Sequence, residues 1–325
     1  MFMFFLSLLS IQETKTDLSK KFQAFSRLLA LKSRQHVFSL HEIRRIVSYS
    51  ANVFPPLDKN VRVNYVEITP ECKSYWIQPI NAYQQSVLLY IHGGAFISNS
   101  AKNYNAVAYR FGKAWGMNVL NVDYRLAPEH PMPAALMDVV HAYKWLLEHS
   151  DKIVVAGDSA GGGLALLLMQ WIVAQNKVDD KNIIPIPICA ALFSPYTDLT
   201  HRNASIKRNN DCDLLLGSDN IDEMLQQIQN WVCPNLTAEN PLCSPYFGSF
   251  SNLPPLYFVV SDNEILFDDT IKSAKKAINA GVTVHVDVGH RLCHAYPIFS
   301  GIFPEAEPIR FNPLTKFQHN LYLKK

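Results

Sequence analysis

The chain has 325 residues, of which 48% are hydrophobic, and its formal net charge is +2. This length can bury a large core and suits one α/β domain with an appended cap. Because acidic and basic residues are mixed along the chain, the composition argues against a nucleic-acid partner and favours a small, neutral or apolar ligand.

The N-terminal segment, residues 1–50, is predicted to form part of a helical cap. Residues 1–10 are mostly apolar, but they have no basic n-region and no clear small-residue cleavage site, and the run is too short to cross a bilayer. We therefore expect an apolar helix end that packs on the cap, without stable membrane insertion; a signal or anchoring segment is the alternative. Residues 18–50 carry apolar side chains at helical spacing, which predicts one or two amphipathic helices.

Residues 51–306 have the pattern of an α/β core. After Pro55 and Pro56, strand and helix patterns alternate, which predicts a parallel sheet with helices on both faces. The continuous apolar run at 87–91 is typical of a strand that is covered on both sides. The expected strands are 61–69, 76–79, 87–91, 117–122, 152–156, 184–193, 256–260 and 282–288. The expected helices are 104–115, 133–149, 161–175, 268–280 and one that starts near 295.

Two segments depart from this alternation. Residues 200–251 are polar and irregular, with one clear helix at 221–231, and we interpret them as an insertion that joins the N-terminal helices in the cap. Residues 307–325 contain two prolines and many polar side chains. We expect them to form a C-terminal extension on the surface.

The cysteines show no C-x-x-C pair and no even framework, although there are six in the chain. In a chain of this length the pattern suggests free thiols in a reducing compartment, so we predict a cytoplasmic protein. Cys293 stands beside His294, but no second cluster of ligands accompanies them, so no metal site is expected. The six are Cys72, Cys189, Cys212, Cys233, Cys243 and Cys293.

Residues 154–163 predict a nucleophilic serine. A β-branched run ends at Gly157, presents Ser159 in the pattern Gly-x-Ser-x-Gly, and continues into a helix. Small residues are needed on both sides because the turn is strained and the helix passes close to the strand. The serine hydroxyl would lie near the N-terminus of that helix, where backbone N–H groups have no partner.

A serine nucleophile needs a histidine base and an acid that orients the base. In a sheet of this kind the chain order is serine, acid and histidine, each after a strand. The strand at 256–260 is followed by Asp262 and Glu264, and the strand at 282–288 is followed by His290 and His294. At this stage both acids and both histidines are candidates.

Ester hydrolysis also needs hydrogen-bond donors for the developing oxyanion. Gly93 and Gly94 follow the strand at 87–91, and paired glycines let backbone N–H groups approach a substrate closely. Ala160 comes immediately after the serine. We predict that the N–H groups of Gly93, Gly94 and Ala160 form an oxyanion hole.

Four stretches resemble the hormone-sensitive-lipase-like branch of the α/β-hydrolases, which includes bacterial carboxylesterases and arylacetamide-deacetylase-like enzymes. They are 92–96 (HGGAF), 123–135 (DYRLAPEHPMPAA), 157–162 (GDSAGG) and 194–198 (SPYTD). The resemblance covers about residues 61–306. It implies an α/β-hydrolase fold with a mostly parallel eight-stranded sheet, helices on both faces, a helical cap and no cofactor or metal.

The resemblance also implies roles for single residues. Glu264 matches the acid of the triad, with Asp262 as the alternative. Counted back from the segment 303–306, the matching histidine is His294, with His290 as the alternative. Ala95 stands where the family usually has a third glycine.

Three charged residues of the second stretch, Asp123, Arg125 and Glu129, are expected to be structural and to bond to one another and to loop backbone. The sequence thus predicts a serine carboxylesterase acting on short-chain acyl esters, with Ser159, Glu264 and His294 as the triad. One alternative is a deacetylase acting on small acetylated amides or sugars; another is a non-catalytic small-molecule binder on the same fold. A homodimer is left open.

Overall fold

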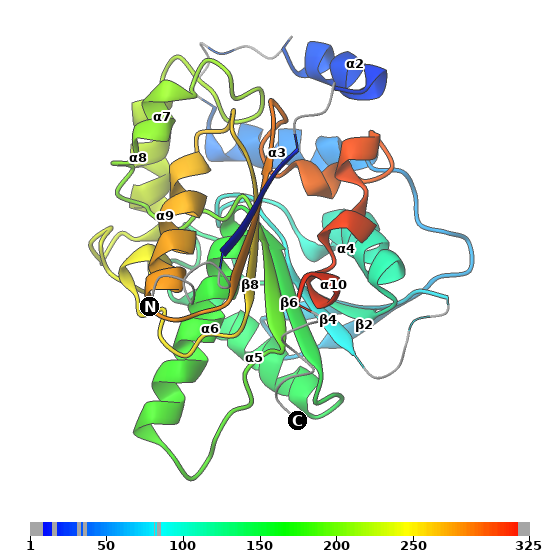
Figure 1. The fold of residues 1–325 in the computed structure, drawn as a ribbon, viewed down its shortest axis with the longest axis vertical. Helices are drawn as coiled ribbons and strands as arrows, with labels where there is room; N and C mark the ends of the chain where they lie inside the picture. Colours follow the sequence, from blue (N-terminus) through cyan, green and yellow to red (C-terminus); the bar gives the residue numbers. More distant parts are fainter. Residues whose placement is uncertain are drawn as a thin grey trace.

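A nine-stranded sheet runs through the centre of the molecule (Figure 1). The computed structural model describes residues 9–14, 18–30, 34, 38–80, 82 and 86–317. The strand order is β1-β9-β8-β7-β6-β4-β5-β3-β2, and the pairs are parallel except that β3 is antiparallel to β2 and to β5. The strands are β1 (Leu9–Thr14), β2 (Arg62–Glu67), β3 (Lys73–Gln78), β4 (Val87–Ile91), β5 (Asn118–Val122), β6 (Ile153–Asp158), β7 (Cys189–Phe193), β8 (Leu256–Ser261) and β9 (Val284–Gly289).

Helices cover both faces of the sheet, which confirms the predicted layers (Figure 1). Alternate side chains of a strand point to opposite faces. In β4, Leu89 and Ile91 join a core whose helices include α5 (Ala134–Leu147), α6 (Ala160–Val178) and α9 (Phe267–Asn279). Leu88 and Tyr90 join a second core, which includes α4 (Ala101–Trp115), the first described helix of the chain and the C-terminal segment.

The two N-terminal helices lie over the rest of the chain (Figure 1). In α2 (Lys20–Leu29), the buried Phe22 packs edge-on against Phe303, with 4.9 Å between ring centroids. In α3 (Leu40–Ser50), Arg44 binds both carboxylate oxygens of Glu129 at 2.6 Å. Among the described helices, none has the length and apolar character that a bilayer crossing requires.

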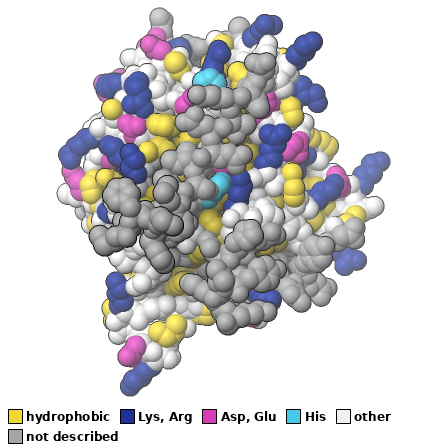
Figure 2. Space-filling model, viewed as in Figure 1, with side chains coloured by type: hydrophobic (Ala, Val, Ile, Leu, Met, Phe, Trp, Pro, Cys, Tyr) yellow, Lys and Arg dark blue, Asp and Glu magenta, His cyan; other side chains and the backbone are white. Residues whose placement is uncertain are grey.

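The insertion contains α7 (Ala204–Arg208) and α8 (Ile221–Val232), and it contacts the N-terminal segment. Arg34 donates to the carbonyl oxygen of Asn210 at 3.0 Å, and its own carbonyl accepts the N–H of Asp219. The predicted joining of the N-terminal segment with the insertion therefore has a direct contact at Arg34. On the face shown in Figure 2, acidic and basic side chains are interspersed.

Two terminal segments differ from the sequence predictions. Leu9 and Ser10, expected in a helix end, begin strand β1, and the rest of the apolar run lies outside the described residues. The helix expected from 295 is instead three short 3₁₀ helices. Pro304 and Pro308 would lie inside a continuous helix, where proline removes a backbone hydrogen bond and collides with the preceding turn. They are Tyr296–Phe299, Pro304–Ala306 and Pro308–Phe311.

The expected C-terminal surface extension is wrong for its described part. Phe311 and Phe317 are only 3% and 2% exposed, and both belong to the core on the α4 side of the sheet. The short helix α10 (Pro313–Lys316) lies between them and contacts β7 and β8. The segment packs against the sheet because burial of these apolar side chains is favourable. Residues 318–325 lie outside the described part.

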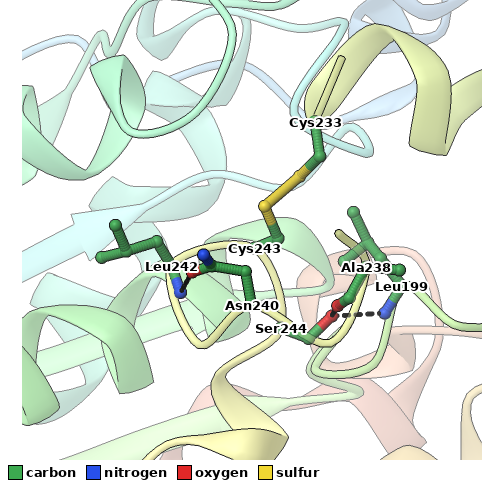
Figure 3. Close-up of a disulfide and its surroundings, with 7 residues drawn as sticks. All are labelled: Leu199, Cys233, Ala238, Asn240, Leu242, Cys243 and Ser244. Carbon is green, nitrogen blue, oxygen red and sulfur yellow. Dashed lines mark hydrogen bonds between the residues drawn. A yellow bond between two sulfur atoms is a disulfide. The ribbon is translucent and has the colours of Figure 1, made fainter. Parts of the chain in front are cut away.

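The prediction of six free thiols is also wrong, because Cys233 and Cys243 form a disulfide (Figure 3). Cys233 is the C-cap residue that follows α8, and the next loop folds back so that the two Cα atoms are 6.5 Å apart, a separation that a disulfide can bridge. The other four cysteines are free, with Cys212 exposed and the rest buried. The cytoplasmic location stays a prediction, and it loses the argument from free thiols.

Candidate active site

Ser159 lies in a strained turn between β6 and α6. Its φ of 53° and ψ of −121° are unusual for a residue with a side chain. Backbone hydrogen bonds hold this conformation: the Ser159 N–H donates to the carbonyl of Phe193 at 2.8 Å, and its carbonyl accepts from Gly163 and Tyr196. The serine is therefore fixed at the start of the helix, as the sequence predicts.

The glycines around Ser159 are required by close backbone approach. A Cβ at Gly161 would lie 2.0 Å from the carbonyl oxygen of Ile91, and one at Gly157 would lie 2.5 Å from the backbone of Gly161. Real Cβ atoms do not come this close to other atoms. The helix thus passes directly against β4 and β6, which explains the Gly-x-Ser-x-Gly pattern.

The structure pairs His294 with Glu264. His294 Nδ1 and Glu264 Oε2 are 2.6 Å apart, and the two side chains are 7% and 0% exposed. Burial lowers the pKa of His294, but the charge of Glu264 and this hydrogen bond outweigh it, so the pKa is raised. The other carboxylate oxygen, Oε1, accepts from the Ser261 N–H and from the Ser194 hydroxyl.

The two alternative residues form a separate, exposed pair. His290 Nδ1 lies 2.6 Å from Asp262 Oδ2, and the side chains are 44% and 33% exposed. His290 also lines a cavity of about 350 Å³ together with Tyr296 and Arg310. None of the described residues lining that cavity is Ser159, Glu264 or His294.

His294 and Ser159 are connected through neighbouring residues. The charge of His294 lowers the pKa of Asp158, so His294 and Asp158 lie within electrostatic range of each other. Asp158 directly precedes Ser159. A second connection runs through β7. The carbonyl of Phe193 accepts the Ser159 N–H, and the hydroxyl of the next residue, Ser194, accepts the N–H of Ala295, which follows His294. The structure thereby brings the three predicted triad residues to one end of the sheet.

The loop after β4 lies against Ser159. A Cβ at Gly93 would be 3.1 Å from Ser159 Cβ and 2.3 Å from a carboxylate oxygen of Asp158, so only glycine fits there. Gly94 has a φ of 123°, and its carbonyl accepts from Ile97 and Ser98. Within the described residues, no acceptor lies in hydrogen-bond range of the N–H groups of Gly94, Ala95 and Ala160.

A buried carboxylate lies beneath this loop. Burial raises the pKa of Asp158 to about 6, against the lowering effect of hydrogen bonds from the hydroxyls of Tyr90 and Tyr104. The backbone N–H of Gly93 also lowers this pKa. Gly93 therefore lies against the Asp158 carboxyl group, as the 2.3 Å approach of its Cβ position to that group also shows.

The charged residues of the second motif are structural, but their partners differ from those expected. Asp123 accepts from the backbone N–H of Ala101, Arg125 pairs with the buried Asp138, and Glu129 pairs with Arg44 of α3. The Arg44 hydrogen bond lowers the pKa of Glu129 to about 2. The three do not bond to one another because each has a partner from another element.

Sequence reasoning gave no role to Ser194 and did not count the N–H of Ala95. Ser194 belongs to the fourth motif, so the signal was present, but its function depends on contacts with residues 70 and 101 positions later. In the described part of the chain, no three histidine, cysteine, aspartate or glutamate side chains are grouped so that they could hold a metal ion.

Comparisons with known proteins place this geometry in context. The model of the alpha/beta hydrolase fold family matches residues 88–298. An acetyl-hydrolase of Streptomyces hygroscopicus is 31% identical over 72% of this chain and 75% of its own length, and an esterase of Acinetobacter venetianus is 33% identical over 68% and 71%. A crystal structure of an esterase from the bacterial hormone-sensitive lipase family has a TM-score of 0.83 at 27% identity, covering 93% of this chain and 99% of that one.

Proposed function

Because the chain belongs to the α/β-hydrolase family, in its hormone-sensitive-lipase-like branch, and is a carboxylic ester hydrolase, we propose that it cleaves short-chain acyl esters with a triad of Ser159, His294 and Glu264. The observation that carries the proposal is the buried 2.6 Å contact between His294 Nδ1 and Glu264 Oε2. A carboxylate at Nδ1 holds the ring so that Nε2 is the basic nitrogen.

The reaction follows from these roles. His294 accepts the proton of the Ser159 hydroxyl as the serine oxygen attacks the ester carbonyl. The resulting imidazolium, stabilised by Glu264, then returns the proton to the alcohol that leaves. Water attacks the acyl-serine by the same proton transfers, releases the carboxylic acid and restores the serine.

The oxyanion would be held by backbone N–H groups. Gly94 and Ala160 supply two of the predicted donors, because their N–H groups have no acceptor among the described residues. We assign the third to Ala95 in place of Gly93, whose N–H acts on the Asp158 carboxylate. Gly93 remains necessary because a side chain there would collide with Asp158.

The acyl group is expected to be short. The N-terminal segment and the insertion contact each other through Arg34, and a cap made of both would enclose the pocket. Deacetylation of a small acetylated substrate is the second candidate, favoured by the similarity to an acetyl-hydrolase. It would use the same residues. The non-catalytic binder is set aside because the relatives are esterases.

The test is hydrolysis of p-nitrophenyl acetate and butyrate by the full chain and its Ser159→Ala variant. We expect turnover in the wild type and a loss on the order of 1,000-fold or more in the variant, because the nucleophile is removed. A fluorophosphonate probe should label the wild type but not Ser159→Ala. The proposal fails if the wild type hydrolyses neither ester or if the variant keeps its activity.

A further inference from the structure

Ser194 is buried directly after β7 and contacts Glu264 and the peptide that follows His294. It is 0% exposed, has a φ of 47°, and donates its N–H to the carbonyl of Val259 at 2.7 Å. Its hydroxyl donates to Glu264 Oε1 at 2.7 Å and accepts from the N–H of Ala295 at 3.0 Å. We propose that Ser194 is a positioning residue that orients Glu264 and His294 for proton transfer; this inference rests on the triad proposed above.

The contacts close a ring. Ser194 binds Glu264, Glu264 binds His294, and the peptide after His294 returns to Ser194 through the Ala295 N–H. One hydroxyl therefore fixes the side chain of the acid and the backbone of the base together. Because catalysis needs reacting groups placed to within a fraction of an ångström, such a ring acts on turnover more than on substrate binding.

The hydroxyl also decides which carboxylate oxygen faces the histidine. Glu264 Oε1 accepts from Ser194 and from the Ser261 N–H, so Oε2 is left to accept from His294. Without the hydroxyl, the Ser261 N–H alone would hold Oε1, and the N–H of Ala295 would lose its acceptor. Both effects allow the carboxylate and the ring to turn away from the working geometry.

The Ser194→Ala variant should lower kcat roughly 10- to 100-fold and leave KM within about twofold of the wild-type value. The acidic limb of the kcat/KM profile should move to lower pH. This shift is expected because Glu264 raises the pKa of His294 while burial lowers it. A weaker contact with Glu264 leaves the effect of burial dominant, so the pKa of His294 falls. Ser194→Gly, which relieves the positive φ, provides a second variant if the alanine variant does not fold.

The matched control is Ser244→Ala. Ser244 is also 0% exposed, its hydroxyl donates to the carbonyl of Ala238 at 2.6 Å and accepts from the Leu199 N–H at 2.8 Å (Figure 3). Each variant therefore loses one hydrogen bond that a buried serine donates and one that it accepts, the acceptor being a carboxylate for Ser194 and a backbone carbonyl for Ser244. We expect a similar loss of melting temperature in both, but an unchanged kcat and an unchanged acidic limb in Ser244→Ala.

The outcomes separate the two proposals. If Ser159→Ala or His294→Ala keeps its activity, the triad itself is wrong. If both lose activity while Ser194→Ala and Ser194→Gly keep kcat and the acidic limb of the wild type, only the role of Ser194 is overturned. A shift of the limb to higher pH, or the same kinetic loss in Ser244→Ala, would also overturn it.

Discussion

At the scale of single residues, the two candidate histidines differ in the surroundings of their rings. His294 is 7% exposed beside a fully buried carboxylate, whereas His290 is 44% exposed beside Asp262. Water competes for an exposed ion pair, so such a pair contributes little, but a buried carboxylate orients and stabilises an imidazolium strongly. The environment therefore favours His294 as the base.

We expect His294→Ala to lower kcat by several orders of magnitude, as Ser159→Ala does, because triad residues act as a unit. His290→Ala should change kcat far less, and its effect should appear in KM or in melting temperature. Steady-state kinetics on p-nitrophenyl butyrate compare the two, with His290→Ala as the matched control. The opposite ranking would show that the exposed pair with Asp262 supplies the base.

The pH dependence of activity should report on the same ring. His294 works as a base only when neutral, and its pKa is raised above the ordinary 6.5 by Glu264 against the effect of burial. kcat/KM should therefore fall as the pH drops, with a midpoint above 6.5. In Glu264→Gln the charge is lost and burial dominates, so the midpoint should move to lower pH while kcat falls. An unchanged midpoint would mean that another group controls this limb.

The strand endings supplied these candidates, and only the resemblance to the family selected Glu264 and His294 among them. Strand endings and chain order are local patterns, and they identified Ser159, two acids and two histidines. Which acid meets which histidine depends on the path of the loop after β9, where Arg291 and Ala295 adopt positive φ. The same limit explains Ser194, whose partners are distant in the sequence.

At the scale of elements, the insertion holds the turn that carries the acid. Asn209, at the end of α7, donates to the carbonyls of Asp262 and Glu264 at 2.9 and 2.8 Å. Asp213 accepts the N–H of Ile265 at 2.9 Å. The position of Glu264 thus depends on a segment outside the sheet as well as on strand β8.

We expect Asn209→Ala to lower kcat about tenfold and to reduce the free energy of unfolding by about 1–3 kcal/mol, since two carbonyls lose their donor. Asn176→Ala is the control, because Asn176 also bridges backbone, through two 2.8 Å hydrogen bonds to Ile184. It should lose stability and keep kcat. Equal kcat in the two variants would show that the insertion does not position the acid. Kinetics and urea unfolding provide both readouts.

Elements with strong periodicity were predicted well. The eight strands from β2 to β9 and the helices α4, α5, α6, α8 and α9 lie where the sequence indicates them. Strand β1 was missed because a short apolar run fits either a helix or a strand until its neighbour is known. The tail was missed because Phe311 and Phe317 are separated by turn-forming residues and become core only through the fold.

At the scale of the whole molecule, the disulfide cross-links part of the insertion, residues 200–251. Cys233 and Cys243 enclose a short loop, and Ser244, the next residue after Cys243, accepts the N–H of Leu199 after β7 (Figure 3). The pairing could not be read from the sequence, because six cysteines allow many pairings and the spacing of these two forms no recognised pattern.

Thiol titration of the denatured protein should find four free cysteines before reduction and six after it. Cys243→Ser should lower the free energy of unfolding by about 2–3 kcal/mol, since a loop of this length loses its cross-link, and it should leave kcat unchanged. Cys212→Ser, at an exposed free cysteine, is the control and should change neither property. Six reactive thiols without reductant would contradict the disulfide.

Strand β1 also has a consequence for association between molecules. Over six residue pairs, from Leu9 with Val284 to Thr14 with Gly289, β1 occupies the outer hydrogen-bonding side of β9. A strand left open there would offer a row of N–H and C=O groups as a template for a second chain. Strand β1 covers that template on β9 and becomes the outermost strand on this side of the sheet. Shortening the chain past Thr14 would expose that template at the strand whose end leads into the loop of His294.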